Sequence, residues 1–472
     1  MKSSDQIYAV FARNVLFPFH ERLKGHVTMR MLREMEREQW IPDDELRELR
    51  AQRLRRLVSH AFRSVPYYSN IAQVHGLSAD QFRSEADLER LPLLSKELIR
   101  GRLEAFKSSD ARNLQCLTTG GSTGSPLAFY LGPTRISSDI AARCRSESWW
   151  GVGIGDREYV IWGSPLELTK QDRLRELRDR VLRTKLLSAF EMNEQTMDRF
   201  IDEILVHGCT RVFGYPSSIH LLCEHARRRN KDLSKAGVRT VFVTAEYLWE
   251  HWRQNIAESF GCPVANGYGG RDSGFIAHEC PARGMHITAD RLIVEIVDHD
   301  GQLLPRGQLG EIVVTHLDTP EMPFIRYRTG DMGALSARTC ACGRTLPLLE
   351  NIDGRKSDFI ATPDGRRMHG LSLIYALRKI AGIDQFQVVQ KSLTFFEVAL
   401  VTNAAFSRQS EAEIKREFSH RIRAEVDVTF RHCEEIPVTP SGKYRYVISQ
   451  VEQARNESEV GLGHRPVRIG QA

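Results

Sequence analysis

The sequence contains no apolar run long enough to cross a membrane. A spanning helix needs about 18 or more consecutive apolar residues, and every apolar stretch in this chain is shorter. The partly apolar segment 1–22 is interrupted by Asp5, Arg13 and Asn14, and no small-residue cleavage site follows it, so a signal peptide is not expected. An amphipathic helix lying on a membrane surface is the alternative for this segment. We therefore expect a cytoplasmic protein with no transmembrane segment.

Cysteine is scarce, and its distribution is irregular. The chain has nine cysteines among 472 residues, and most of them are scattered. An odd, scattered set excludes a disulfide framework and is typical of reduced thiols.

The chain also lacks internal repeats, low-complexity tracts and a strong excess of one charge. Its net charge is +6, with Arg-rich stretches near the N-terminus. Solvated helix faces explain these stretches better than a nucleic-acid surface does, and a mildly basic protein suits anionic nucleotides. We predict small-molecule ligands, no nucleic-acid partner, and a monomer or homodimer.

A chain of 472 residues exceeds the size at which a single core usually stops growing, so two or three domains are expected. In residues 1–110, apolar residues recur close to the helical spacing, which predicts a helical N-terminal segment of the first domain. In residues 111–354, the apolar runs 159–162, 210–215 and 239–246 predict buried strands, each followed by a helix. This alternation predicts an α/β fold with mixed sheets.

The pattern changes after residue 290. Residues 291–298 and 310–318 are rich in strand-forming residues with a turn between them, which predicts a β-rich subdomain built on a hairpin or small barrel. Residues 355–453 predict a small α+β C-terminal domain, and the polar residues 454–472 predict a flexible tail.

The segment 118–126, Thr-Thr-Gly-Gly-Ser-Thr-Gly-Ser-Pro, is rich in glycine and hydroxyl groups. Its glycines allow close backbone approach and its hydroxyls add donors, so the loop can surround a polyphosphate. It is not a Walker A loop, because no Gly-Lys-Ser/Thr follows, and by itself it fits a surface loop equally well. The candidate nucleotide-binding residues in it are Thr119, Gly120, Gly121, Ser122, Thr123 and Gly124.

After a predicted strand, the segment 266–272 (Asn-Gly-Tyr-Gly-Gly-Arg-Asp) combines an aromatic ring, glycines and a carboxylate. Tyr268, next to Gly269, can stack on a purine, and Asp272 can hold Mg²⁺. Taken alone, the segment is explained better by a plain turn after a strand.

Two further segments carry charged groups on glycine-containing turns. In 326–331 (Arg-Tyr-Arg-Thr-Gly-Asp), Asp331 can accept two hydrogen bonds from a ribose, and the arginines suit phosphates; a surface salt-bridge cluster is the alternative. In 440–445 (Pro-Ser-Gly-Lys-Tyr-Arg), Lys443 is mobile enough to reach a site on another domain, although most loop lysines are simply solvated.

The order of these segments resembles that of the adenylate-forming superfamily, which includes acyl-CoA ligases, peptide-synthetase adenylation domains and luciferases. Residues 118–126 resemble its phosphate loop, and 267–272 lie where its Tyr-Gly-x-Thr/Ser-Glu motif falls. Residues 327–331 match its ribose motif, 354–358 resemble its hinge, and 440–445 match its C-terminal catalytic-lysine motif. All five occur in order.

Within the superfamily, the chain looks most like the phenylacetate–CoA ligase and CapK-like branch. The segments 54–69, 322–331 and 340–347 resemble that branch, and the ending 436–449 looks more like CapK members than like phenylacetate enzymes. The likeness extends from about residue 46 to about residue 450. It implies a large N-terminal domain and a small C-terminal domain that rotates about the hinge.

Three positions depart from the superfamily pattern. Leu127 stands where many relatives carry a lysine after the phosphate loop, as is common in this branch. Asp272 replaces the magnesium-binding glutamate, and Ser357 replaces the first hinge aspartate.

The resemblance implies an ATP-dependent ligase. A carboxylic acid attacks the α-phosphate of ATP to give an acyl-adenylate, and the acyl group then passes to an acceptor. Lys443 and Arg355 take the catalytic roles, Asp272 holds Mg²⁺ and Asp331 binds the ribose. The remaining implied positions are Ala245 and Glu246 in the nucleotide pocket, and Tyr215 and Pro216 in the acyl pocket.

The acceptor is not fixed by the sequence. Coenzyme A, giving a thioester, is the leading interpretation. Transfer to an amine or a hydroxyl, as the CapK likeness suggests for polysaccharide or specialised-metabolite biosynthesis, is the first alternative. A nucleotide-binding assembly protein without catalysis is the second, and the intact Lys443 and Asp331 argue against it.

A possible zinc site stands apart from these motifs. Cys340 and Cys342 form a compact thiolate pair on a turn, and Cys280 with His286 can complete a closed Cys₃His structural site. His278 competes with His286 as the nitrogen ligand, and reduced, partly buried cysteines are the alternative. Some relatives in the branch carry zinc at similar cysteines.

Overall fold

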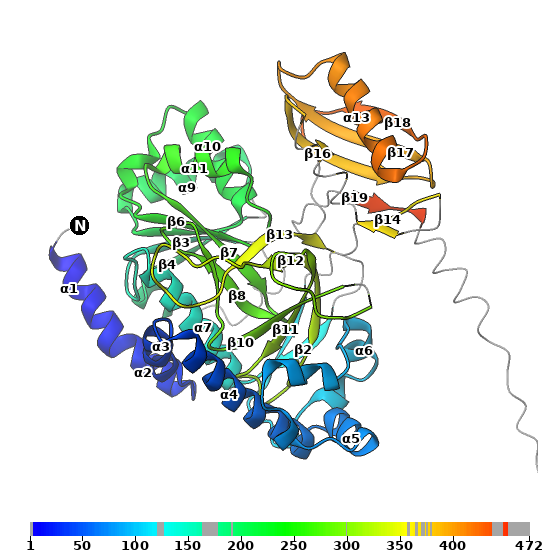
Figure 1. Ribbon diagram of the computed structural model, residues 1–472. Helices are drawn as coiled ribbons and strands as arrows, with labels where there is room; N and C mark the ends of the chain where they lie inside the picture. The colour runs from blue at the N-terminus through cyan, green and yellow to red at the C-terminus, as the bar shows by residue number, and fades with distance from the viewer. Residues whose placement is uncertain are drawn as a thin grey trace, which may run out of the picture. The chain divides into compact units, whose positions relative to one another are not determined.

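The computed structural model divides into two compact units, Met1–Ile352 and Asp353–Ala472, and each is described by itself (Figure 1). Among the described residues, no helix is both long and apolar enough to span a membrane. The described residues are 3–119, 127–162, 178–189, 192–298, 300–355, 359–363, 367–369, 373, 376–377, 380–436 and 447–451.

The first unit begins with helices, as the apolar spacing of residues 1–110 predicts. Helix α4 buries Leu54, Leu57 and Ala61, and it ends at Ser64 because Pro66 has no N–H to continue the ladder and begins the next helix instead. The helices of this part are α1 (Ser3–Phe11), α2 (Phe17–Leu23), α3 (Thr28–Glu38), α4 (Asp43–Ser64), α5 (Pro66–His75) and α6 (Lys96–Gly101). A π-helical turn, Ala12–Leu16, joins α1 to α2.

A seven-stranded sheet forms the centre of the first unit, in the order β4-β3-β5-β6-β7-β8-β9. Strands β4 to β7 are parallel, and β8 and β9 are antiparallel. The three predicted apolar strands are β3, β5 and β6, whose runs are nearly unbroken because both faces of the sheet are covered. The strands are β3 (Glu158–Trp162), β4 (Thr184–Ser188), β5 (Arg211–Gly214), β6 (Thr240–Thr244), β7 (Val264–Gly270), β8 (Gly274–Glu279) and β9 (Met285–Ile287).

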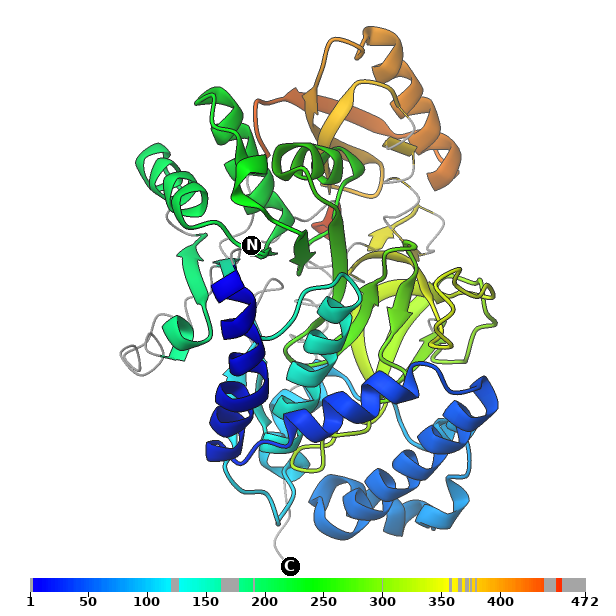
Figure 2. The ribbon, with the colours of Figure 1, turned by 90° about the vertical axis from the view of Figure 1, so that its left-hand side faces the viewer.

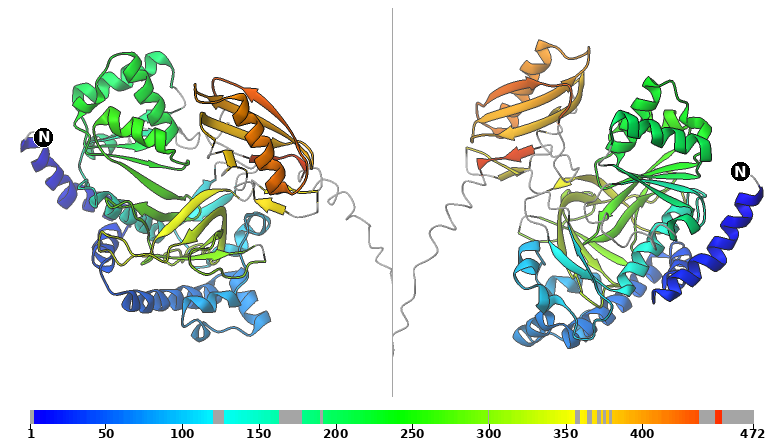
Figure 3. Two further views of the ribbon diagram at one scale, coloured as in Figure 1. Left: turned by 45° about the horizontal axis from the view of Figure 1, so that its top comes forward. Right: turned by 180° about the vertical axis from the view of Figure 1, so that it is seen from behind.

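Helices cover both faces of this sheet (Figures 1 and 3). Helices α9 (Glu194–His207), α10 (Pro216–Arg228) and α11 (Glu250–Phe260) share one apolar core with β3, β5 and β6. On the other face, α7 (Pro133–Ser148) packs against α3 and β8. The arrangement is the α/β layering that the sequence predicts.

A four-stranded sheet, in the order β10-β11-β12-β13, lies beside the central sheet in the first unit. The predicted hairpin is its antiparallel pair β10–β11. A two-stranded sheet of β1 and β2 carries the glycine-rich segment between its strands. These strands are β1 (Gln115–Thr118), β2 (Ala128–Leu131), β10 (Leu292–Val297), β11 (Gly310–His316), β12 (Tyr327–Leu335) and β13 (Leu349–Arg355).

The second unit is a small α+β structure. Its four-stranded sheet has the order β18-β17-β16-β19, and helix α13 (Arg408–Ile422) buries Ile414, Phe418 and Ile422. The amide of Gln390 bonds both the N–H and the carbonyl of Ala361, which ties the short β14–β15 pair to this sheet. The strands are β14 (Phe359–Ala361), β15 (Arg367–His369), β16 (Ile383–Gln390), β17 (Phe395–Thr402), β18 (Asp427–His432) and β19 (Val447–Ser449).

Candidate active site

Several of the predicted site residues lie at one edge of the central sheet, at the carboxyl ends of its parallel strands. In open α/β sheets this edge is where ligands bind. Tyr215 follows β5 directly, Ala245 and Glu246 follow β6, and Tyr268 lies in the last part of β7. The aromatic ring of Tyr215 stacks on Trp162, which ends β3, with ring centroids 4.1 Å apart.

The turn after β6 is held in an unusual backbone conformation. Ala245 has a positive φ of 72°, which costs energy for a residue with a β-carbon and is frequent at functional sites. Thr244 anchors the turn by donating its hydroxyl to the carbonyl of Gly267 at 2.8 Å. On the other side, the Glu246 carboxylate accepts the N–H of Ser217 at 3.1 Å, at the positive N-terminal end of α10.

Two predicted motifs from different sheets meet at Tyr268. Its hydroxyl donates to Oδ2 of Asp331, which lies on β12, at 2.9 Å. Burial, together with the charge of Asp331, raises the pKa of Tyr268 well above its ordinary value, so the phenol stays a donor. The backbone N–H of Asp331 in turn donates to the Thr329 hydroxyl at 3.1 Å. Tyr268 therefore orients the carboxylate of Asp331, and Thr329 fixes its backbone.

The neighbouring turn is compact because glycine occupies a position where no side chain fits. A β-carbon on Gly269 would lie 2.2 Å from the carbonyl oxygen of Gly274 on the adjacent strand. Substitution there would therefore push β7 and β8 apart at the point where Tyr268 is presented.

Asp272 pairs with a second tyrosine and with a lysine. The hydroxyl of Tyr327 donates to Oδ2 of Asp272 at 2.5 Å, and Nζ of Lys96 lies 3.9 Å from the same oxygen. Lys96 also donates to the carbonyl of Thr329 at 3.0 Å. The carboxylate thus has a cation beside it and stands next to the Asp331 motif.

Lys96 is a residue that the motif analysis missed. It is the first residue of α6, where the helix dipole disfavours a positive charge. A lysine at the start of a helix, directly after the N-cap Ser95, is the one sequence signal that could have singled it out.

The glycine-rich segment is described only at its two ends. The N–H of Thr119 donates to the carbonyl of Leu127 at 2.9 Å, and the N–H of Leu127 donates to the Thr119 hydroxyl at 3.0 Å. These two hydrogen bonds therefore hold the two ends of the loop together. Leu127 is completely buried, which explains why an apolar residue stands where many relatives carry lysine.

A cavity lies directly behind these strand ends, between α7 and the central sheet. Two of its lining residues, Thr244 and Gly267, immediately precede Ala245 and Tyr268 in the chain. The floor of the cavity therefore adjoins the nucleotide motifs. Its other lining residues include Arg143, Phe213, Phe242, Asn266, Phe275 and His278.

The cavity has a polar end. The ring of His278 stacks on Phe275 at 5.1 Å, and burial lowers the pKa of His278 to about 3, so the imidazole is neutral. Within the described part of the chain, no donor reaches the buried Oδ1 of Asn266. A buried acceptor without a partner is costly, so the cavity offers both groups to a polar atom of a ligand.

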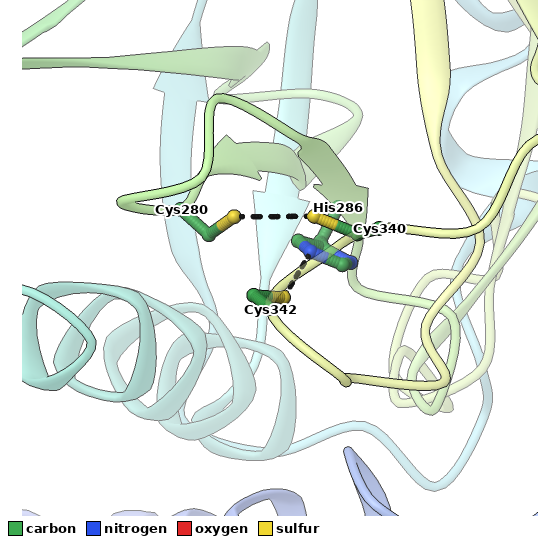
Figure 4. A group of neighbouring side chains, drawn as sticks. All are labelled: Cys280, His286, Cys340 and Cys342. Atoms are coloured by element: carbon green, nitrogen blue, oxygen red, sulfur yellow. Dashed lines mark hydrogen bonds between the residues drawn. The ribbon is translucent and has the colours of Figure 1, made fainter.

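The cysteine–histidine group comes together as one cluster (Figure 4). The sulfurs of Cys280 and Cys340 are 3.5 Å apart, and Nε2 of His286 is 3.1 Å from the sulfur of Cys342. The four ligand atoms all lie within 4.8 Å of one another. His286, not His278, is the nitrogen donor of this group, since His278 lines the cavity.

The donor set of this cluster fits a tetrahedral metal ion. Nδ1 of His286 lies 3.0 Å from the carbonyl oxygen of Leu346; that hydrogen bond would leave Nε2 free as a ligand, an orientation common in metal sites. Cys280 and His286 are almost fully buried, at 0% and 1% exposed. Three soft thiols and one imidazole at such spacing are the ligand set of structural zinc sites.

Comparisons with known proteins agree with this geometry. A profile of the AMP-binding enzyme family matches residues 186–317, and a profile of the CapK C-terminal domain matches residues 360–450. Protein CapK of Staphylococcus aureus is 24% identical over 413 residues, 87% of this chain and 90% of that protein. A phenylacetate-coenzyme A ligase of Thermus thermophilus is 28% identical over 334 residues, 68% of this chain and 72% of the ligase.

These matches support a place for the chain in the adenylate-forming superfamily. Its relatives place it in the branch that contains phenylacetate–CoA ligases and CapK. A 2-hydroxyisobutyryl-CoA ligase in complex with 2-HIB-AMP shares the fold, with a TM-score of 0.69 and 21% identity over 90% of this chain and 94% of the other. An amide bond synthetase from Marinactinospora thermotolerans aligns with a TM-score of 0.50 and 21% identity, over 72% of this chain and 69% of the other.

Several residues that the superfamily pattern singles out lie outside the described residues. These are Gly120, Gly121, Ser122, Thr123, Gly124, the hinge residues Lys356 and Ser357, and Lys443. Arg355 ends β13, and its side chain is likewise outside the description. The roles of these residues stay predictions.

Proposed function

We propose that this protein activates a carboxylic acid as an acyl-adenylate with ATP and then transfers the acyl group to coenzyme A. The observation that carries the proposal is the meeting of Tyr268 and Asp331, two motif residues from different sheets, at the carboxyl edge of the central sheet. The similarity to phenylacetate-coenzyme A ligases, over about two thirds of this chain, supports the same reaction.

The chemistry explains why such an enzyme needs a nucleotide site. A carboxylate is a poor electrophile, because oxide would have to leave. Its oxygen therefore attacks the α-phosphorus of ATP, pyrophosphate leaves, and the mixed anhydride that forms has AMP as its leaving group. The thiolate of coenzyme A then attacks the acyl carbon and AMP departs. The first transition state gathers negative charge on phosphate oxygens, so fixed cations stabilise it.

The nucleotide is proposed to lie along the strand ends. Asp331, whose carboxylate accepts from Tyr268 and whose backbone N–H donates to Thr329, accepts hydrogen bonds from the two ribose hydroxyls. The turn of Ala245 and Glu246 forms one side of the base pocket in this proposal. The positive φ of Ala245 is an unusual conformation that the surrounding structure must hold, as is common at functional sites.

The phosphates are proposed to lie toward Asp272. Its carboxylate is a hard oxygen ligand of the kind that Mg²⁺ prefers, and the ion would neutralise phosphate charge there. Lys96 adds a further positive charge, 3.9 Å from the same carboxylate. Arg355 and Lys443 complete the cation set in this proposal, and the 119–124 loop adds N–H and hydroxyl donors.

The acyl group is proposed to enter the cavity between α7 and the central sheet, with Tyr215 and Pro216 at its rim. The cavity is small, so a compact acid is expected. The neutral imidazole of His278 and the unpartnered oxygen of Asn266 favour an acid that carries a hydroxyl or amino group away from its carboxylate, because such a group satisfies both.

The second half-reaction is proposed to follow a rotation of the C-terminal domain about Gly354, Arg355, Lys356 and Ser357. The same active-site surface of the first unit would then serve both half-reactions, since Lys443 withdraws after adenylation and before the acceptor enters. Cys280, His286, Cys340 and Cys342 are proposed to hold a structural zinc ion with no open coordination position.

The proposal is tested by ATP–pyrophosphate exchange with a panel of compact acids in matched pairs, each apolar acid beside its hydroxylated or aminated counterpart. Product analysis with and without coenzyme A follows for each acid that supports exchange. We expect exchange with a polar member of the panel and a thioester only when coenzyme A is present. Exchange with no acid would refute the adenylation step, and an amide or ester product would refute the acceptor.

A further inference from the structure

The N-terminal helix presents its apolar side to solvent. Segment α1–α2, with the π turn between its two parts, runs along the surface of the first unit (Figure 2). We call its exposed large apolar residues the outer stripe. These are Ile7 (68% exposed), Val10 (60%), Phe11 (47%), Val15 (49%), Phe19 (63%) and Leu23 (72%).

The π turn keeps the stripe on one side. Residues four apart drift around an α-helix, because a turn holds 3.6 residues. The wider turn at Ala12–Leu16, with its hydrogen bonds spanning five residues, offsets that drift. Phe11 and Val15 therefore align with Phe19 farther along the helix.

The opposite side of the helix is fixed to the body of the protein. A β-carbon on Gly155 would lie 2.7 Å from the β-carbon of Ala12, so the helix packs closely there. The Tyr8 hydroxyl donates to the carbonyl of Val181 at 2.8 Å, and Arg183 pairs with Asp5 at 3.1 Å. The helix is held by these contacts and cannot turn its stripe inward without breaking them.

The charges around the stripe indicate what covers it. The exposed charged side chains of this segment and of the residue that caps it are cationic: Arg13, Arg22 and Lys24. Arg13 lies 3.9 Å from Glu36 on the neighbouring α3, so Arg22 and Lys24 supply most of the positive charge available here. The two carboxylates of the segment are engaged elsewhere: Asp5 with Arg183, and the buried Glu21 with its own neighbours. A second copy of the chain would bring two sets of cations together, whereas an anionic surface would meet them with opposite charge.

We propose that the outer stripe docks this protein on the surface of an anionic lipid bilayer, with the α1–α2 axis parallel to the membrane. Apolar side chains enter the boundary between headgroups and acyl chains, and the flanking cations contact lipid phosphates, as in other surface-lying amphipathic helices. The proposal does not depend on the reaction proposed above.

The test is co-sedimentation of the full chain with vesicles of phosphatidylcholine, alone or mixed with phosphatidylglycerol. We expect binding to the mixed vesicles that weakens as salt is raised. The double variant Phe11→Ser/Phe19→Ser should lower the partition coefficient by about tenfold or more for each side chain. Val206→Ser, at an equally exposed apolar residue on α9 (76% exposed), is the matched control and should bind as wild type does.

Three results would overturn the proposal. The first is no binding to phosphatidylglycerol vesicles at low salt, and the second is unchanged binding by the double variant. The third is a lipid-free dimer in analytical ultracentrifugation that the same variant converts to monomer, which would assign the stripe to a second copy. Unfolding midpoints and ATP affinity check the fold of each variant, and Ile7→Ser/Leu23→Ser repeats the test if the first variant unfolds.

Discussion

Replacing Asp331 by alanine separates its proposed role in binding from its role in structure. A hydrogen bond to a charged group contributes about 1.5–3 kcal/mol, so losing the ribose acceptor should raise the Kd for ATP roughly ten- to hundredfold. The same change leaves the Tyr268 hydroxyl, now 2.9 Å from the carboxylate, without its acceptor. An orphaned buried polar group costs about 1–3 kcal/mol of folding stability.

The two effects can be measured independently, by calorimetric titration with ATP and by the midpoint of unfolding. Tyr268→Phe keeps the carboxylate, so its ATP affinity should stay within a few-fold of wild type. The double variant Tyr268→Phe/Asp331→Ala should regain part of the stability that Asp331→Ala loses, because no hydroxyl is left unpaired, but it should not regain ATP affinity. Unchanged ATP affinity in Asp331→Ala would refute the ribose assignment.

Four further changes have defined outcomes. Lys443→Ala should abolish acid-dependent pyrophosphate release while ATP affinity stays nearly constant, because the lysine acts mainly in the transition state. Lys96→Met should lower the Mg²⁺ concentration needed for exchange several-fold, since a cation that competes for the proposed metal carboxylate is removed. Untagged protein should contain about one zinc per chain, and Cys340→Ser/Cys342→Ser should lose it and unfold at a lower temperature. Wild-type protein should unfold at a lower temperature at about pH 5 than at about pH 7, and this fall in unfolding midpoint should be smaller in His278→Gln. Burial lowers the pKa of His278 to about 3. When the pH drops below the ordinary pKa of histidine, only the unfolded chain therefore protonates this side chain, which favours unfolding.

Each of these experiments has a control and a contradicting result. Lys391→Ala is the control for Lys443→Ala: it changes a lysine on the second unit that pairs with Glu397 and should leave turnover intact. Turnover near the wild-type value in Lys443→Ala would refute the catalytic role of Lys443. An unchanged Mg²⁺ requirement would count against the pairing of Lys96 with Asp272. Cys116→Ser, at an exposed free cysteine, should retain the metal, and metal-free protein whose paired cysteines alkylate readily would favour plain thiols. An equal loss of stability with acid in the His278 variant would contradict its buried, neutral state.

Much of the architecture could be predicted from residue patterns, because buried parallel strands leave a strong signal. The runs at 159–162, 210–215 and 239–246 became β3, β5 and β6 for that reason. The family, the α/β fold and the small C-terminal α+β structure were also predicted correctly. The domain limits at 110 and 453 and the roles of the site residues stay predictions.

Other features could not be read from the sequence, because they depend on which elements lie side by side. The cavity draws on α7 and on four strands of one sheet, and no local pattern sets that register. For the same reason the sequence indicates His286 as a metal ligand without excluding His278, since each lies near Cys280 in the chain. The two histidines lie opposite each other on β8 and β9, and only the neighbouring elements distinguish them: Cys342 lies beside His286, and the cavity lies beside His278.

The candidate active site and the cysteine cluster depend on the same junction between two sheets. Tyr268 pairs in register with Ala277 on β8, and Cys280 follows the end of that strand. Cys340 and Cys342 lie in the segment between β12, which carries Asp331, and β13. A metal ion held by both sides would therefore fix the spacing across which Tyr268 reaches Asp331, and a hydrogen bond of 2.9 Å tolerates little widening. A metal ion in the cluster would therefore support the geometry of the proposed nucleotide site as well as the stability of the unit, because its ligands lie at the junction of these two sheets.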